Sequence, residues 1–409
     1  MLVKLAWRNL WRNRLRTSIM LAAMVFGLLG VIVMIGFISG LYSNMIQNAI
    51  AWQTSHLQIH SRNYLDHPDI QDTLVNPDAI TALLSSSPTV EGWSARLVVD
   101  GMVASARSTR GIRINGVVPE AEANVSPVAR HIREGLWLDA EGRNPVVVSV
   151  KTAERLRLKL GSKVVLTFTG PDGEVSGAAF RVRGLFKSPI SAFDDSQLFV
   201  RRSDLAALAQ LDGVHEIAVI TEDGAEANGP ATAQLIQQLR TLNDANSVRD
   251  WQAVQPMLAA ILGQMGVSNA IILAIYVLAM SFGIVNLMLM SVFERTREFG
   301  VLMAVGMTKP RVLLLILLEA GLLGLCGGVL GVVTSVGVIA LLGHTGIPLG
   351  AMADGLAAFG ADTQLYPEVT RSDYLMVLTT VLAASLLSAL YPARQILRQR
   401  PAEAMAHRH

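Results

Sequence analysis

The sequence is poor in cysteine and in charge, and both shortages limit its class. Among 409 residues there is one cysteine, Cys326, and 16% are Asp, Glu, Lys or Arg. A single cysteine excludes an intrachain disulfide and leaves the redox compartment undetermined. Low charge together with 51% hydrophobic residues is typical of a membrane protein. The net charge of +2 gives no indication of a nucleic-acid partner.

Patterns that signal common active sites are also missing. No lysine follows a glycine, so there is no Walker A loop for ATP, and neither Gly-x-Ser-x-Gly nor His-Glu-x-x-His occurs. His56 and His60 share one face of an expected strand, but no third ligand stands at a metal-site spacing, which favours ordinary polar roles. We expect no catalytic residue, no metal site and no cofactor held by this chain.

Four apolar windows are long enough to cross a bilayer, which takes about 20 residues. We expect membrane spans at 17–50, 254–293, 309–343 and 373–393. The alternative for the first window is a cleaved signal peptide, but its apolar run exceeds the usual 7 to 15 residues of such peptides. Four spans place both termini on the same side.

Basic residues gather at three places and predict the orientation. They precede the first span, separate the second from the third and follow the fourth: Lys4, Arg8, Arg12, Arg14 and Arg16; Arg295, Arg297, Lys309 and Arg311; Arg394, Arg398, Arg400 and Arg408. The positive-inside tendency makes 1–16, 294–308 and 394–409 cytoplasmic. Segments 51–253 and 344–372 are then external.

The first sixteen residues have tryptophan and arginine at helical spacing. Trp7 and Trp11 are four apart, as are Arg8 and Arg12. One interpretation is an amphipathic helix on the cytoplasmic leaflet, in contact with membrane lipid. The other is an aromatic and basic belt that orients the first span. Both can hold.

The segment 51–253 has the composition of a soluble α+β domain, and its length allows one lobe or two. Alternating apolar runs predict strands near 55–60, 95–103, 112–118, 146–150, 164–169, 180–186, 197–200 and 216–220. Helical patterns occur near 77–84, 152–158, 203–211 and 231–242. The expected fold is therefore a membrane protein with four transmembrane helices and a large extracytoplasmic domain.

The second span is longer than a bilayer requires. A continuous helix over 256–293 would be about 57 Å long, whereas the hydrocarbon core is about 30 Å thick. We expect a stiff rod that continues into the external domain. The alternative is a break near Gly263 or Gly266.

The third span combines small residues with an acid. Gly324 and Gly328, and likewise Gly327 and Gly331, are small-xxx-small pairs that favour close helix packing. Glu319 is the acid within the spans, and we favour a contact with a neighbouring helix or coupling region over an acid that merely reaches the interface. In the fourth span, Pro392 is expected to stop or kink the helix.

A charged island separates the second and third spans and reads F-E-R-T-R-E-F-G-V-L-M-A-V-G-M-T-K-P-R over 293–311. An apolar set follows the charges: Phe299, Val301, Leu302, Ala304 and Val305. This pattern predicts an amphipathic surface helix docked on another protein, with a solvated loop as the alternative. Gly306 suits the helix end, and Pro310 suits the start of the next helix.

The island resembles the E-R-x-x-E-(I/F)-G-x-x-x-A-x-G signature of FtsX/MacB/LolC-LolE permeases of ABC transporters. The ending Y-P-A-R-Q-I-L-R-Q-R-P-A-E-A-M over 391–405 is similar to that family's tail, although Ile396 replaces a small residue. G-F-I-S-G-L (36–41), S-H-L-Q-I-H (55–60) and G-L-F-K-S-P-I-S-A-F-D-D-S (184–196) are most similar to lipoprotein-release permeases.

This resemblance implies an inner-membrane half-transporter of the mechanotransmission type with a MacB-type periplasmic core domain. It implies a second protomer, identical or paralogous, and two cytoplasmic ATPase subunits that bind ATP and Mg. The loop between the second and third spans would be the coupling helix, with these residues in or beside the ATPase: Glu294, Arg295, Arg297, Glu298, Gly300, Ala304 and Gly306. The first two spans of both protomers would face each other.

The expected activity is ATP-driven extraction or export of a lipoprotein or another lipophilic substrate, with a periplasmic carrier as a possible partner. Two alternatives stay open. One is an FtsX-like regulator of a periplasmic hydrolase, against which the large external domain counts. The other is MacB-like drug or peptide efflux, against which the lack of a fused N-terminal ATPase counts.

Overall fold

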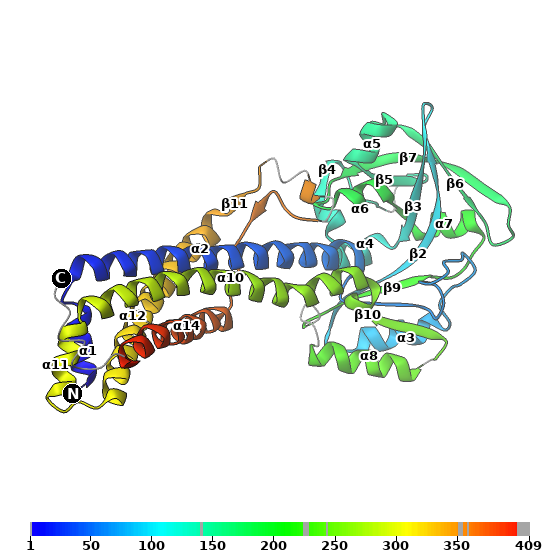
Figure 1. Ribbon diagram of the computed structural model, residues 1–409. Coiled ribbons are helices and arrows are strands. Elements are labelled where there is room, and N and C mark those ends of the chain that lie inside the picture. Colours follow the sequence, from blue (N-terminus) through cyan, green and yellow to red (C-terminus); the bar gives the residue numbers. More distant parts are fainter. Residues whose placement is uncertain are drawn as a thin grey trace. The chain divides into compact units, whose positions relative to one another are not determined.

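The computed structural model describes residues 2–139, 142–223, 229–242, 244–350, 355–357 and 360–398. The chain divides into two compact units. The helical unit comprises Met1–Leu41, Gly263–Pro348 and Gln364–His409, and the α/β unit comprises Tyr42–Leu262 and Leu349–Thr363. Figure 1 labels many of the helices and strands of both units.

Among the residues that the structure describes, four long helices are apolar enough to cross a membrane, which confirms the expected four-helix architecture. They are α2 (Arg14–Ala49), α10 (Pro256–Glu294), α12 (Lys309–Thr345) and α14 (Arg371–Arg398). α10 runs unbroken through Gly263 and Gly266, so the helix is continuous as expected. Pro256 opens it, where a missing N–H costs nothing.

Helix α12 packs closely on its neighbours through glycine. Four glycines lie at these contacts, Gly324 and Gly328 against α14 and Gly327 and Gly331 against α2. A Cβ on Gly324 would lie 2.2 Å from the Ser385 hydroxyl oxygen, and one on Gly331 would lie 2.6 Å from the Leu28 side chain. Both distances are below any tolerable contact, so each spacing pair serves one neighbouring helix.

Two short helices complete one end of the helical unit. They are α1 (Leu2–Leu10) and α11 (Thr296–Ala304), and α1 packs on α12. Their buried side chains Ala6 and Phe299 join an apolar core with α10, α12 and α14. The side chains in this core are mostly large and aliphatic or small, and they pack together without polar groups.

Of the two outcomes expected at Pro392, a stop or a kink, the stop is wrong. α14 continues through Pro392 to Arg398. Ala389 and Ala393, on either side of the proline, are fully buried against the unit's core. This packing offsets the hydrogen bond that proline removes. The expected tail beyond 398 lies outside the described residues.

The expected external loop 344–372 holds a short hairpin, β11 (Ile347–Pro348) with β12 (Gln364–Leu365). Next to it, the Asp373 carboxylate accepts hydrogen bonds from the Thr370 N–H and hydroxyl, at 2.9 and 2.7 Å. This capping arrangement starts α14.

In the described part of the α/β unit, ten strands form one mixed sheet. They are β1 (Leu57–Ser61), β2 (Val90–Ala104), β3 (Thr109–Val117), β4 (Ile132–Gly135), β5 (Pro145–Ser149), β6 (Lys163–Thr169), β7 (Val175–Phe186), β8 (Gln197–Arg201), β9 (Glu216–Thr221) and β10 (Asn246–Asp250). The order is β10-β1-β9-β2-β3-β8-β5-β7-β4, and β6 pairs with β2 and β7.

Strand β2 joins two parts of this sheet, each with its own core. Its segment 90–96 pairs with β9, and its segment 97–104 pairs with β3. One core gathers around Ile59 and Ile217, the other around Leu97 and Phe180. The two lobes that the length allowed therefore share a single long strand.

The helices of this unit include four that the sequence pattern indicated. Those four are α3 (Pro77–Ser86), α5 (Val150–Leu156), α7 (Arg202–Ala209) and α8 (Pro230–Leu242). Helical segments that it did not indicate are α4 (Pro119–Val125), η2 (Pro127–His131), α6 (Ser191–Ser196) and α9 (Trp251–Val254). These segments are four to seven residues long.

A π-helical turn, η1 (Ile50–Thr54), follows α2 and leads into β1. Ser55 after it has φ 56° and ψ −168°, a conformation that glycine adopts readily and serine does not. Its neighbour Thr54 is buried and donates its hydroxyl proton to the Ser55 carbonyl at 3.0 Å. The chain thus changes direction through a strained residue.

Candidate functional site

Helix α11 has two different faces. Phe299 is 1% exposed and packs inward, with Leu302 and Met303 partly buried beside it. On the other face Val301 is 48% and Val305 is 83% exposed. The expectation of one apolar docking stripe is therefore wrong in part: at 100° per residue, Phe299 and Leu302 rotate into the protein's own core.

The outward face has an apolar centre and a charged border. Ala304 lies exposed with Val301 and Val305, and Arg297 and Glu298 lie exposed on the same side. Separations of three, four, seven and eight residues put these five side chains on one side of the helix. Such a surface is suited to contact with another protein.

Arg295 precedes α11 and points into the helical unit. It donates two hydrogen bonds from Nη1 to the Glu319 carboxylate of α12, at 3.0 and 3.2 Å, and one from Nε to Glu298 at 2.9 Å. Its guanidinium carbon lies 5.3 Å above the centre of the Phe299 ring. Arg295 and Glu319 are 8% and 7% exposed, so they form a buried ion pair.

The N-terminal segment adds further partners to this pair. Asn9 donates its amide N–H to the Glu319 Oε1 at 2.7 Å. Arg12 pairs with Glu298 and Arg16 with Glu294, each at 2.7 Å. We name the set Asn9, Arg12, Arg16, Glu294, Arg295, Glu298 and Glu319 the polar network. It ties α1, α2, α10, α11 and α12 together.

The residues expected as membrane anchors occupy mixed environments. Trp7 and Arg8 are exposed, Trp11 is partly buried, and the two tryptophan rings meet edge to face with 6.0 Å between centroids. Arg12 is largely exposed yet bound to Glu298. Their contact with lipid stays a prediction.

Both charges at the α11 entrance are retained at neutral pH. Burial raises the pKa of Glu298, but hydrogen bonds from Arg295 and Arg12 outweigh it and leave that pKa below its ordinary value. Burial lowers the pKa of Arg295, but Glu319 outweighs this and leaves it above its ordinary value. Arg295 and Glu298 therefore meet as full ionic charges.

The exit of α11 is a sharp turn. Gly306 has φ +104°, and its N–H and that of Met307 donate to the carbonyls of Met303 and Leu302, at 3.1 and 2.9 Å. Pro310 then stands in the first turn of α12. This turn and the polar network hold α11 at both ends.

The expected coupling residues thus fall into two groups. Exposed ones are Glu294, Arg297, Glu298, Ala304 and Gly306, and inward ones are Arg295 and Gly300. An inward side chain does not meet a docked partner in this conformation, so Arg295 can act there only by positioning α11. Asn9 and Arg16 were missed, because nothing in the sequence relates them to acids about 280 residues or more away.

His56, directly before β1, and His60 within β1 make structural contacts in the α/β unit. His56 accepts from the Thr221 N–H at 3.0 Å, and His60 is buried against the His215 carbonyl. In the part of the chain that the structure describes, no three His, Cys, Asp or Glu side chains group as metal ligands.

Two family models match the chain over both units. The MacB-like periplasmic core domain matches residues 17–239, and the FtsX-like permease C-terminal domain matches residues 270–401. The chain belongs to the FtsX/MacB family of ABC-transporter permeases. The α/β unit of this permease is its periplasmic domain, and its long helices place it in the inner membrane.

Individual relatives carry two kinds of name. The Neisseria meningitidis lipoprotein-releasing system transmembrane protein LolC is 25% identical over 96% of this chain and 94% of its own length. The Chlorobium luteolum macrolide export protein MacB is 32% identical over 47% of this chain and 27% of its own. The periplasmic region of Actinobacillus actinomycetemcomitans MacB matches 53% of this chain and 97% of its own at a TM-score of 0.38 and 13% identity.

Proposed function

We propose that this permease couples ATP hydrolysis by a separate cytoplasmic ATPase subunit to movement of its periplasmic domain. The outward face of α11, formed by Arg297, Glu298, Val301, Ala304 and Val305, carries this proposal. We name it the docking face. The protein that binds this face is an ABC-type ATPase subunit. The family consists of ABC-transporter permeases, and this chain has no Walker A loop with which to bind ATP itself.

The docking face is held in one orientation by the polar network behind it. Buried Arg295 and Glu319 fix the inner side of α11, while valines with no internal role stay exposed. A push on α11 is therefore passed to α12 and α1 through a chain of hydrogen bonds from Glu298 to Arg295, from Arg295 to Glu319 and from Glu319 to Asn9. The proposal places this end of the permease, and both termini, in the cytoplasm.

A second protomer is the proposed partner of α10. Asn286 is exposed within the span Gly266–Met290 and makes no hydrogen bond to any residue that the structure describes. By contrast, hydroxyls of Thr334 and Thr380 return to carbonyls of their own helices. An amide facing lipid is unfavourable, which supports a protein neighbour there. Two protomers would recruit two ATPase subunits.

The proposed substrate is a lipoprotein or another lipophilic molecule of the inner membrane. Similarity to LolC extends over almost the entire chain and almost all of that relative, whereas similarity to MacB covers half of this chain. Macrolide-type export is the second candidate, because that shorter match has the higher identity. A periplasmic carrier is the proposed acceptor in the first case.

Copurification tests the docking proposal. Val305→Lys places a charge at the apolar centre of the docking face, and we expect it to remove the copurifying ATPase and its stimulated hydrolysis. Val175→Lys is the matched control, since Val175 is 76% exposed in the periplasmic domain. Equal ATPase recovery with both variants would refute the proposal. Mass spectrometry of material bound to the unaltered complex separates lipoprotein from drug-like substrates.

A further inference from the structure

The chain between the third and fourth spans returns to the α/β unit. Leu349–Thr363 belongs to that unit, whereas α12 before it and α14 after it belong to the helical unit. A surface loop is ordinarily mobile, because few contacts hold it. Residues 360–362 of this loop are instead bound to two other segments of the α/β unit, as follows. The coupling proposal above does not use them.

The first of these segments is the C-terminal end of α2. Asn44 Nδ2 donates to Asp362 Oδ2 at 2.8 Å, and the Asp362 backbone N–H donates back to Asn44 Oδ1 at 2.9 Å. One turn later, Asn48 Nδ2 donates to the Gly360 carbonyl at 2.8 Å. Residues four apart lie on one face of a helix, so both asparagines face the loop. We name these three hydrogen bonds the loop contact.

The second segment lies directly before α6, within 184–196. A Cβ on Gly360 would lie 3.0 Å from the Cγ1 of Ile190, so the loop backbone packs against this side chain. Gly360 has φ +86°, a conformation that glycine adopts freely. Ile190 is buried in one core with Trp52 of η1 and Phe193 of α6. The loop therefore reaches a core of the periplasmic domain.

After the loop, the chain follows α2 within the helical unit. The Glu368 N–H donates to the Gly36 carbonyl at 3.0 Å, and a Cβ on Gly40 would lie 2.2 Å from the Tyr366 carbonyl oxygen. The residues of α2 that meet segment 360–369 thus recur every four positions: Gly36, Gly40, Asn44 and Asn48. This spacing forms one stripe along the helix, in which glycines leave room for the backbone and asparagines bind it.

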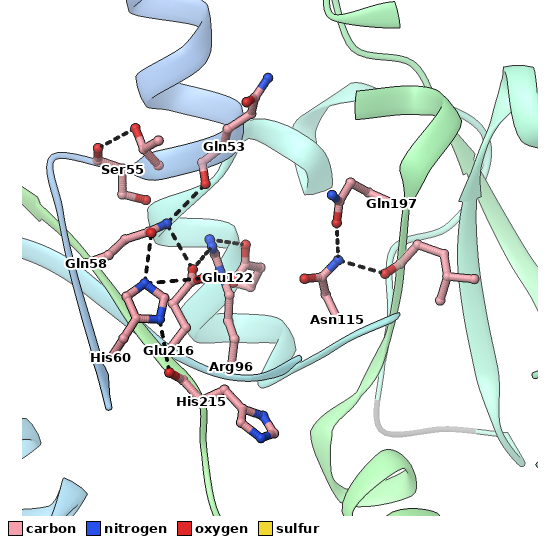
Figure 2. A network of polar contacts seen from close by, with 12 residues as sticks. Gln53, Ser55, Gln58, His60, Arg96, Asn115, Glu122, Gln197, His215 and Glu216 are labelled. Atoms are coloured by element: carbon pink, nitrogen blue, oxygen red, sulfur yellow. Dashed lines mark hydrogen bonds and ion pairs between the residues drawn. The ribbon is translucent and has the colours of Figure 1, made fainter. Parts of the chain in front are cut away.

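The end of α2 is in turn bonded to the sheet. After η1 (Ile50–Thr54), Gln58 of β1 donates from Nε2 to the Gln53 carbonyl of η1 and to Glu216 Oε1 of β9, at 3.2 Å each. Figure 2 shows Gln58 there, beside the Arg96 guanidinium that donates to Glu216 at 2.6 Å. Arg96 belongs to β2, the strand that both lobes share. A displacement of the end of α2 therefore acts on this strand through hydrogen-bonded neighbours.

We propose that segment 360–369 transmits the movement of α14 to the end of α2 and so to the periplasmic domain. α14 begins at Arg371, directly after this segment, and packs on α12. The inference rests on the coupling proposal, in which α12 receives the push on α11. It assigns Asn44 and Asn48 as positioning residues that keep the loop on α2 while the ATPase turns over.

An exchange of the paired side chains tests the loop contact. Asn44→Asp places two carboxylates together, and their repulsion should open the contact. Adding Asp362→Asn restores both hydrogen bonds with the side-chain donor and acceptor reversed, and the backbone N–H of residue 362 keeps its acceptor. Asn63→Asp is the matched control, since Asn63 is exposed in the same domain and its side chain makes no hydrogen bond to a described residue.

The readout is amide hydrogen exchange of the permease with its copurified ATPase in nanodiscs, measured by mass spectrometry. Without nucleotide, all variants should match the unaltered permease in the sheet, which shows that they are folded. ATP with vanadate should change exchange in peptides from 42–262 of the unaltered permease and of Asn63→Asp. Asn44→Asp should lose most of this change while it keeps the bound ATPase, and the double variant should regain it.

Two results would overturn the inference. One is a full nucleotide response in Asn44→Asp, and the other is a double variant that responds no better than the single one. Asn48→Ala removes the bond to the Gly360 carbonyl without adding charge, so it should weaken the response even if Asn44→Asp fails to fold. An unaltered permease that retains no ATPase would overturn the docking proposal, and this inference with it.

Discussion

The buried Arg295–Glu319 pair allows a quantitative test of the polar network. Glu319→Leu would leave the Arg295 guanidinium, 8% exposed, without its main counter-charge. Removing one partner of a buried pair costs about 3 to 5 kcal/mol. Because Arg295 keeps its bond to Glu298, we expect the lower value, about 3 kcal/mol. The amide of Asn9 also loses its acceptor.

A double-mutant cycle separates this interaction from simple loss of packing. The double variant Arg295→Met/Glu319→Leu removes both charges. It should be more stable than either single variant, with a coupling energy above about 2 kcal/mol between the two positions. The assay is reversible denaturant unfolding of the purified permease in detergent. Arg12→Ala is the control, since its exposed pair with Glu298 should contribute under about 1 kcal/mol. Additive losses in the cycle would refute the reasoning.

Three further predictions concern separate features of the chain. Gly331→Val should destabilise the permease by about 1 to 3 kcal/mol, because the added side chain clashes with Leu28. Gly343→Ala should not destabilise it, because the space around Gly343 is open. The denaturant midpoints of unfolding of the two variants test this difference. Glu298 has a lowered pKa in the folded protein, so its contribution to stability is present above the ordinary pKa range of a carboxyl group and is lost as pH falls through the folded-state pKa. Glu298→Gln should therefore flatten the acid side of the curve of stability against pH. An unchanged acid side would contradict this prediction. Ser55→Gly should stabilise by about 1 kcal/mol, since only glycine adopts this conformation freely; a lower melting temperature would count against it.

The periodicity of apolar residues and the distribution of charge predicted most of the fold. Long apolar runs with little charge indicated the four membrane helices, and the 324/328 and 327/331 spacings predicted close packing of α12. The sequence did not predict β4 (Ile132–Gly135) or β10 (Asn246–Asp250), because both strands are short and polar and lack the alternation of apolar and polar residues that marks a strand. They are strands because neighbouring strands pair with them.

The position of the short helix α11 was predicted, but not which of its faces is buried. The charged island did become a surface helix, yet sequence could not assign Phe299 inward and Val305 outward, because both belong to the same apolar set. Likewise, the role of Glu319 was anticipated only as a helix contact. Its partners Asn9 and Arg295 meet it through tertiary structure, which local patterns do not encode.

Cross-linking tests the central claim most directly. In a Cys326→Ala background, Val305→Cys places one thiol at the centre of the docking face, and Val175→Cys places one in the periplasmic domain as the control. With a short thiol cross-linker, the account predicts that the Val305→Cys permease is joined to an ATPase subunit and the control is not. A Val305 thiol that is instead labelled by a membrane-impermeant reagent from the periplasmic side would contradict the account.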